Sequence, residues 1–291
     1  MTRVVVVHGV GQQFLGKGVL HSAIGLAVLD GLDNAGLETS GLTPADVSVA
    51  FYGRVFRQPG TKDLSDLPLI EEIEDDFETA LLRVWWEGGA LQEPDRIESP
   101  ERSGSKAPVP RSVQHMMEAL TRSRSMTKIA QRFLLGSLRQ VNRYLNETGI
   151  RERAQECVSG AVGADTRVLV GHSLGSVVAY EALCAHPQWP VTTFVTLGSP
   201  LGIRNLIFDR LRPPPVAGRG EWPGGVASWT NLCDVNDVVA LVKKLGPQFD
   251  PPGGWRRVKD KTLDNGWKVH DLIHHLTDSD TGRAVAAGLR L

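Results

Sequence analysis

The sequence predicts an α/β protein with a mainly parallel sheet flanked by helices and with an inserted helical segment. Short β-branched runs alternate with segments in which apolar residues recur every three or four positions, and this alternation is typical of parallel sheets. The alternation stops between residues 54 and 136 and then resumes. A chain of 291 residues is long enough for one large core with an insertion. We therefore predict a core of residues 1–53 and 137–291 and a helical cap of residues 54–136.

The first half of the chain supplies two strands and the cap. A β-branched run predicts a strand at residues 3–7 that ends at the glycine turn 8–11. Helical spacing predicts a helix over residues 19–28, and a second strand is expected at residues 47–52. Within the cap we expect helices around residues 70–86 and from residue 113 onwards. A polar connection with a mobile centre at residues 99–110 should join them, since so long a loop is rarely without structure of its own.

The second half continues the alternation to the end of the chain. A helix is expected around residues 137–158, a strand at 167–170, a helix from Ser176 and a strand at 191–197. A segment rich in proline and glycine then crosses from residue 213 to 225. Further strands are expected at residues 227–233 and 255–258, and a helix closes the chain.

Charge and cysteine usage exclude several classes of protein. The chain has 32 basic and 33 acidic residues, so nothing favours a nucleic-acid partner. The most cationic stretch, residues 122–143, carries apolar residues at helical spacing and is interpreted as a solvated helix face. The three cysteines are widely spaced, which favours neither a disulfide framework nor a zinc site. We expect no metal and no organic cofactor.

Apolar runs are short throughout the chain. None approaches the roughly 18 residues of a membrane span, and the run at residues 4–7 is too short for the core of a signal peptide. We therefore expect a cytoplasmic protein with no transmembrane segment. Peripheral contact with a membrane and the oligomeric state are left open.

Ser173 is the candidate nucleophile. It is the centre of the segment Gly-His-Ser-Leu-Gly at residues 171–175, which lies between a predicted strand and a predicted helix. A serine at the tip of such a sharp turn brings the residues two before and two after it into contact, which explains the two glycines. The turn also places the Leu174 N–H at a helix start, where an oxyanion is stabilised. The five-residue pattern alone arises by chance in about one chain in five of this composition.

A serine hydroxyl needs a base, and that base is usually a histidine oriented by a carboxylate. In chain order the acid and then the histidine should follow Ser173, on loops after later strands. Asp234 and Asp237 compete as the acid, because both come just after a predicted strand. The histidine candidates all lie near the closing helix: His270, His274 and His275.

At these positions the chain resembles intracellular lipases and phospholipases of the α/β-hydrolase superfamily. In those enzymes the acid lies in a pattern Asn-x-x-x-x-x-Asp-Pro-Val-Ala. Here the matching positions are Asn231, Asp237, Val239 and Ala240, with Val238 in place of proline. The resemblance implies that Asp237 is the acid and that Asp234 caps the turn.

The same resemblance bears on the base and on the oxyanion hole. The lipases carry a pattern His-x-x-x-x-Tyr-Leu before the last helix, which implies that His270 is the base and that a histidine replaces the tyrosine. Their His-Gly oxyanion loop is similar to residues 8–13, which implies that the Val10 N–H joins the Leu174 N–H in the oxyanion hole. His8 then has a structural role. A Leu-Gly-Ser-Pro turn at residues 197–200 also resembles these lipases, and Ser199 is no rival nucleophile because Pro200 removes the following N–H.

The expected function is therefore cleavage of a carboxylic ester by a Ser-His-Asp triad through an acyl-enzyme. Large apolar residues in the cap favour a lipid ester over a small polar one, although such residues usually form core. The leading alternative is an acyltransferase or thioesterase that acts on a biosynthetic intermediate, because fold alone does not fix function. A non-catalytic binding protein that retains the fold is the third hypothesis.

Overall fold

The computed structural model describes residues 2–12, 15–37, 41–57, 73, 76–99, 109–120, 122, 128–253, 257–266 and 268–291. Within these residues, six strands form one open sheet in the order β2-β1-β3-β4-β5-β6. Every neighbouring pair of strands is parallel, which establishes the predicted α/β class. The strands are β1 (Val4–Val7), β2 (Val47–Ala50), β3 (Val168–His172), β4 (Thr193–Leu197), β5 (Ser228–Asp234) and β6 (Val258–Leu263).

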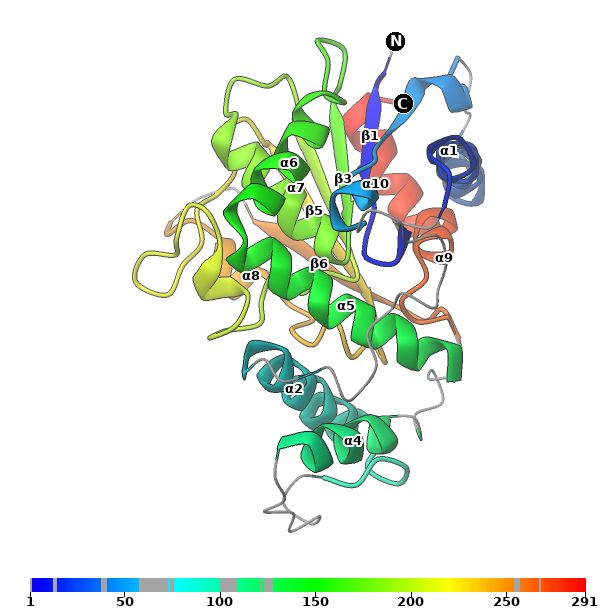
Figure 1. Ribbon diagram of the computed structural model, residues 1–291. Coiled ribbons are helices and arrows are strands. Elements are labelled where there is room, and N and C mark those ends of the chain that lie inside the picture. Colours follow the sequence, from blue (N-terminus) through cyan, green and yellow to red (C-terminus); the bar gives the residue numbers. More distant parts are fainter. Residues whose placement is uncertain are drawn as a thin grey trace.

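Helices cover both faces of the sheet (Figure 1). One face carries α1 (Lys17–Asn34), α9 (Leu272–Thr277) and α10 (Ser279–Leu289), and the other carries α6 (Thr148–Ser159) and α7 (Leu174–Ala185). The remaining helices are α2 (Asp76–Gln92), α4 (Val109–Leu120), α5 (Lys128–Asn146) and α8 (Gly246–Phe249). Short 3-10 turns occupy residues Pro44–Asp46, Gly53–Phe56 and Phe208–Arg210.

The core is divided into two layers by the sheet. Side chains alternate along a strand, so Val5 and Val7 of β1 join the apolar cluster under α6 and α7, whereas Val4 and Val6 join the cluster under α1 and α10. All four valines are fully buried. A strand that is buried on both faces has no polar positions, which is why β1 reads as an unbroken β-branched run.

Three helices, α2, α4 and α5, lie beyond one end of the sheet (Figure 1). There α5 crosses the ends of the strands, and α2 and α4 lie farther out. The helix expected over residues 137–158 is instead two helices, because Glu147 is extended (φ −102°, ψ 103°) between α5 and α6. Of the expected mobile centre at residues 99–110, residues 100–108 lie outside the described residues.

The last strand differs from its prediction. A strand was expected at residues 255–258, of which 255 and 256 lie outside the described residues, and β6 runs from Val258 to Leu263. The strand is the edge of the sheet, and its middle residues are polar and mostly exposed, so it has no apolar run. In the described part of the chain, no helix is long and apolar enough to cross a membrane.

Candidate active site

The order of the strands reverses at β1 and β3. From β1 the chain moves outwards to β2 and then returns to the other side of β1 with β3. Ligands of open parallel sheets bind at such a reversal, outside the carboxyl ends of the strands. The segment after β1 begins at His8, and the segment after β3 begins at Ser173. The candidate nucleophile and the candidate oxyanion loop therefore follow the two strands at which the strand order reverses.

Ser173 has a strained backbone between β3 and α7, with φ 53° and ψ −131°. A Cβ at Gly171 would lie 2.5 Å from Ser176 Cα, and a Cβ at Gly175 would lie 2.3 Å from the His8 carbonyl oxygen. Neither position has room for a side chain. Strain of this kind costs about 1–3 kcal/mol and is found mainly at functional sites. The elbow geometry that the five-residue pattern predicts is present.

The loop after β1 packs directly against Ser173. A Cβ at Gly9 would lie 2.8 Å from Ser173 Cβ, so glycine is needed for this close approach. Leu174 is the first residue of α7, and the Ser173 side chain makes no capping hydrogen bond to that helix. The first N–H groups of a helix lack partners within it and favour an anion. Leu174 thus begins the helix beside the loop that carries Val10.

His8 stabilises this loop and has no free nitrogen. Its Nε2 accepts hydrogen bonds from the backbone N–H groups of Tyr52 (3.2 Å) and Gly53 (3.3 Å). The proton must therefore be on Nδ1, which donates to the Gly9 carbonyl at 2.7 Å. Burial lowers the pKa of His8 to about 4, against the weaker opposing effect of the Gly9 hydrogen bond. The ring is neutral and structural.

Asp237 and His270 form a hydrogen-bonded pair. The Nδ1–H of His270 donates to Oδ2 of Asp237 over 2.6 Å. The other carboxylate oxygen accepts from the backbone N–H groups of Val239 (2.9 Å) and Ala240 (3.3 Å). Asp237 is fully buried, and burial alone raises its pKa, but attraction to His270 and their hydrogen bond outweigh that effect and hold the pKa below its usual value.

Asp234 has a different environment. Its Oδ1 accepts from the backbone N–H of Asn236 at 2.7 Å, and its Oδ2 accepts from the backbone N–H of Asn265 at 2.5 Å. Burial raises the pKa of Asp234 despite these hydrogen bonds. The carboxylate thus caps two turns and has no hydrogen bond to a histidine among those described.

Ser173 and His270 converge on the end of β4. The Ser173 N–H donates to the Leu197 carbonyl at 2.9 Å. At the next residue, Gly198, a Cβ would lie 2.9 Å from His270 Nδ1 and 3.0 Å from the carboxylate of Asp237. His270 Nε2 is buried and has no hydrogen-bond partner among the described residues. This nitrogen is the one left to accept a proton, because Nδ1 is bound to Asp237.

The other two candidate histidines have different surroundings. His274 is partly exposed and its Nδ1 pairs with Asp271 at 2.8 Å, in the first turn of α9. His275 is fully buried. Its Nε2–H donates to the Val269 carbonyl at 3.2 Å. Neither histidine has a hydrogen bond to Asp237 among those described.

Ser199 belongs to the packing beneath the elbow. Its Oγ is 2.7 Å from the Ser176 Oγ and accepts from the Leu201 N–H at 3.3 Å. The Ser176 hydroxyl in turn donates to the Ser173 carbonyl at 2.6 Å. These buried hydroxyls hold the turn that carries Ser173.

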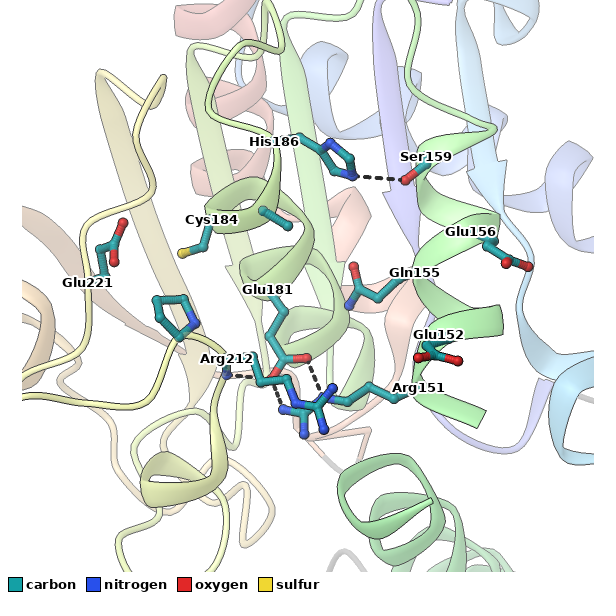
Figure 2. Close-up of a pocket in the computed structure, with 12 residues that line it drawn as sticks. Arg151, Glu152, Gln155, Glu156, Ser159, Glu181, Cys184, His186, Arg212 and Glu221 are labelled. Carbon is teal, nitrogen blue, oxygen red and sulfur yellow. Dashed lines mark hydrogen bonds and ion pairs between the residues drawn. The ribbon is translucent and has the colours of Figure 1, made fainter. Parts of the chain in front are cut away.

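A second serine–histidine contact lies in a pocket of about 670 Å³ on the flank formed by α6 and α7 (Figure 2). There the Ser159 Oγ and the His186 Nε2 are 3.3 Å apart. The other ring nitrogen of His186 pairs with the Gln188 amide at 3.4 Å, and no described carboxylate binds the ring. The nearby Arg151 and Glu181 form a buried ion pair. Among the described residues of this pocket, the histidine therefore has no carboxylate to orient it as a base.

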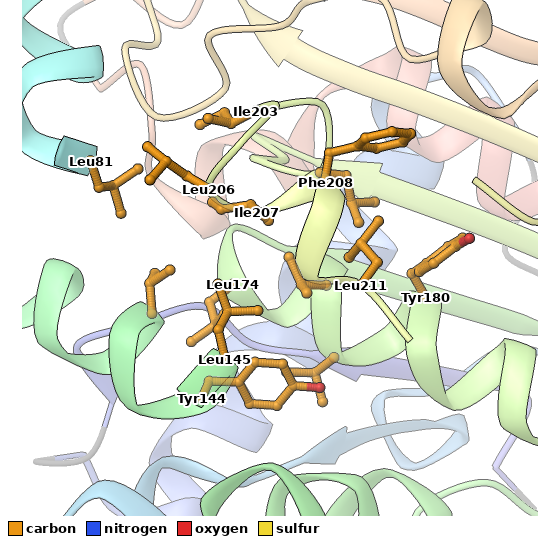
Figure 3. Close-up of a cluster of buried hydrophobic side chains, with 14 of the residues drawn as sticks. Leu81, Tyr144, Leu145, Leu174, Tyr180, Ile203, Leu206, Ile207, Phe208 and Leu211 are labelled. Carbon is orange, nitrogen blue, oxygen red and sulfur yellow. The ribbon is translucent and has the colours of Figure 1, made fainter. Parts of the chain in front are cut away.

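A cluster of buried apolar side chains includes Leu174, the residue after Ser173 (Figure 3). Leu174 is buried in a cluster with Leu81 of α2 and with the segment that follows β4. Helix α2 also contacts the segment after Asp237, because a Cβ at Gly88 of α2 would overlap Leu241. Ser173 itself is only 3% exposed.

Two residues beside the candidate site gave no signal in the sequence. Lys243 donates its ammonium protons to the carbonyls of Asp234 (2.8 Å) and Asp237 (2.6 Å), which fixes the acid turn. Burial lowers the pKa of Lys243, and the charge of Asp237 opposes this effect. His172 was noted only as part of the elbow pattern, yet its Nε2–H donates to the His270 carbonyl at 3.2 Å.

No protein-family model, no curated protein and no solved structure matches this chain. The fold is compatible with that of α/β-hydrolases. In the described part of the chain, no group of three or more histidine, cysteine or carboxylate side chains is placed to hold a metal ion.

Proposed function

We propose that the protein is a serine hydrolase of the α/β-hydrolase type that cleaves a carboxylic ester. The hydrogen bond of 2.6 Å between Asp237 and His270 is the observation that carries the proposal. It links two residues that are 33 positions apart in the chain. The pair lies beside Gly198, and the preceding residue, Leu197, accepts a hydrogen bond from the Ser173 N–H. An oriented histidine beside a serine on a strained turn is the arrangement that activates a hydroxyl.

The proposed reaction has two halves. In the first, His270 Nε2 removes the Ser173 hydroxyl proton while Oγ attacks the ester carbonyl. The Leu174 and Val10 N–H groups hold the oxyanion, and each such donor contributes about 2.7–4 kcal/mol to the transition state. The imidazolium, stabilised by Asp237, then protonates the departing alkoxide, and the acyl group remains on Oγ. In the second half, a water molecule gives a proton to His270 as its oxygen attacks the acyl-enzyme. The acyl–Oγ bond then breaks, His270 returns that proton to Ser173 Oγ, and the carboxylic acid leaves.

The ionisation of Asp237 supports this assignment of roles. A carboxylate that orients the base must stay ionised, so that it accepts the Nδ1–H and stabilises the imidazolium. Contacts with His270 hold the pKa of Asp237 below its usual value, whereas burial raises that of Asp234. Asp237 is therefore the better acid of the two.

The apolar surroundings favour a substrate with an apolar acyl chain. Leu174 lies at the proposed oxyanion position and belongs to the apolar cluster of Figure 3, which also contains Leu81 of the cap. An apolar chain can replace the contacts of such side chains when the cap moves, whereas a polar group would lose its water without gaining partners. We therefore expect hydrolysis of p-nitrophenyl octanoate to exceed that of the acetate.

Ester hydrolysis tests the proposal. Wild-type protein is expected to release p-nitrophenol, and Ser173→Ala is expected to reduce the rate to the background. Ser159→Ala is the matched control, because that serine also contacts a histidine but lies in the pocket on the α6 and α7 flank. Wild-type protein that cleaves none of a series from acetate to dodecanoate would refute ester hydrolysis. Products that form from an added alcohol or amine in preference to water would favour the acyltransferase alternative.

A further inference from the structure

Two buried histidines hold the loop that carries His270. The Nε2–H of His172 donates to the carbonyl of His270, and the Nε2–H of His275 donates to the carbonyl of Val269, each over 3.2 Å. The two acceptors are consecutive carbonyls of one turn. His172 and His275 are 6% and 0% exposed, and their rings reach this turn from β3 and from α9.

Both rings must be neutral in this arrangement. His275 accepts at Nδ1 from the Asn265 amide at 3.4 Å, so its one proton is on Nε2. Burial lowers its pKa to about 4, aided by repulsion from His270 and opposed by the charges of Asp237 and Asp271. Burial also holds the pKa of His172 well below its usual value, with repulsion from His270, His275 and His8 adding to the effect.

We infer that His172 and His275 are positioning residues, which fix the ring of His270 against Asp237 by holding its backbone at two consecutive carbonyls. The inference rests on the proposed function, in which His270 is the base. Two hydrogen bonds to adjacent peptide groups restrict the rotation of the backbone at His270. The ring then keeps the direction that its hydrogen bond to Asp237 requires.

The unpartnered nitrogen of His172 argues against a merely space-filling role. Its Nδ1 is buried without a hydrogen-bond partner among the described residues. A buried polar atom without a partner costs about 1–3 kcal/mol, which an apolar ring of the same size would avoid. The His172 ring lies 4.9 Å from the His270 ring and 5.9 Å from the His275 ring, measured between centroids. Its Nε2–H makes the hydrogen bond to the His270 carbonyl, and this is the group that acts on the loop.

The test compares substitutions that remove the donor with substitutions that keep it. His172→Phe and His275→Phe keep a ring and lose the N–H. Asparagine at either position is polar but too short to reach the carbonyl, and it serves as a second loss variant if a phenylalanine variant does not fold. Glutamine places an amide N–H near the position of Nε2. His274→Phe is the matched control, because His274 lies in the same helix and pairs with Asp271 only.

Two readouts separate positioning from stability and from the proposed function. The first is the proton resonance of the His270 Nδ1–H, which reports its hydrogen bond to Asp237 whether or not the protein is an enzyme. The second is the rate of labelling by a fluorophosphonate probe, measured on protein shown to be folded by its thermal transition.

We expect the loss variants to label about 10- to 100-fold more slowly and to lose the sharp Nδ1–H resonance, because a misplacement of about 1 Å can cost 100-fold. The glutamine variants and His274→Phe should stay within about threefold of wild type. Folded loss variants that retain both the labelling rate and the resonance would overturn the inference. If wild-type protein does not label at all, the proposed function fails, and the resonance alone then decides whether the two histidines position the ring.

Discussion

A methyl group at Gly198 is expected to disturb the candidate triad directly. The Cβ of Gly198→Ala would lie 2.9 Å from His270 Nδ1 and 3.0 Å from Asp237 Oδ2, whereas ordinary contacts of a Cβ begin at 3.4 Å. The His270 ring therefore has to move by about 0.5 Å, and a misplacement of about 1 Å costs about 100-fold in rate. We expect labelling by a fluorophosphonate to slow about tenfold. The left-handed backbone of Gly198 (φ 54°) adds about 1–2 kcal/mol of destabilisation.

Gly36→Ala separates the two effects. Gly36 also has a left-handed backbone (φ 71°), but a Cβ there has no neighbour within 4 Å. This control should lose about the same free energy of unfolding in urea and should label at the wild-type rate. Equal labelling rates for wild type and folded Gly198→Ala would refute the reasoning. They would mean that the added methyl group does not displace the His270 ring, or that the position of this ring does not affect labelling.

Three further predictions concern the acid, the pH dependence of stability and the flank of the molecule. Asp237→Asn should slow labelling about 10⁴-fold, the cost seen when the triad acid of a serine protease is replaced by its amide, whereas Asp234→Asn should slow it less than tenfold. A larger loss of labelling rate in Asp234→Asn than in Asp237→Asn would identify Asp234 as the acid. Burial lowers the pKa of His8 and of His275 from 6.5 to about 4, so unfolding in urea should show full stability above pH 6.5 and a loss of about 3 kcal/mol for each ring as the pH falls towards 4. A flat profile over this interval would contradict burial of the neutral rings. Arg151→Met leaves a buried carboxylate without its partner and should lower the free energy of unfolding by about 3–5 kcal/mol, with no change in the labelling rate of the folded protein.

Much of the fold could be predicted because buried parallel strands have a plain signature. β1 and β3 are covered on both faces, so β1 is a continuous apolar run and β3 begins with one. The edge strand β6 has no such run, because one side of it faces solvent, and its position was predicted wrongly. The break between α5 and α6 was also missed, since the periodic pattern continues across Glu147.

The candidate site could be predicted only in part. The two glycines around Ser173 follow from local sterics, and chain order brings Asp237 and His270 to neighbouring strand ends, where they form a hydrogen bond. Their catalytic role stays a prediction. The hydrogen bonds of Lys243 and His172 to backbone carbonyls join distant segments, and no local pattern encodes such contacts.

Covalent labelling tests the central claim most directly. Wild-type protein is treated with a fluorophosphonate, and the modified residue is located by mass spectrometry of proteolytic peptides. The account predicts a single adduct on Ser173, which is absent from Ser173→Ala and about 10⁴-fold slower to form in Asp237→Asn. An adduct on another serine, or no adduct in folded wild-type protein, would contradict it.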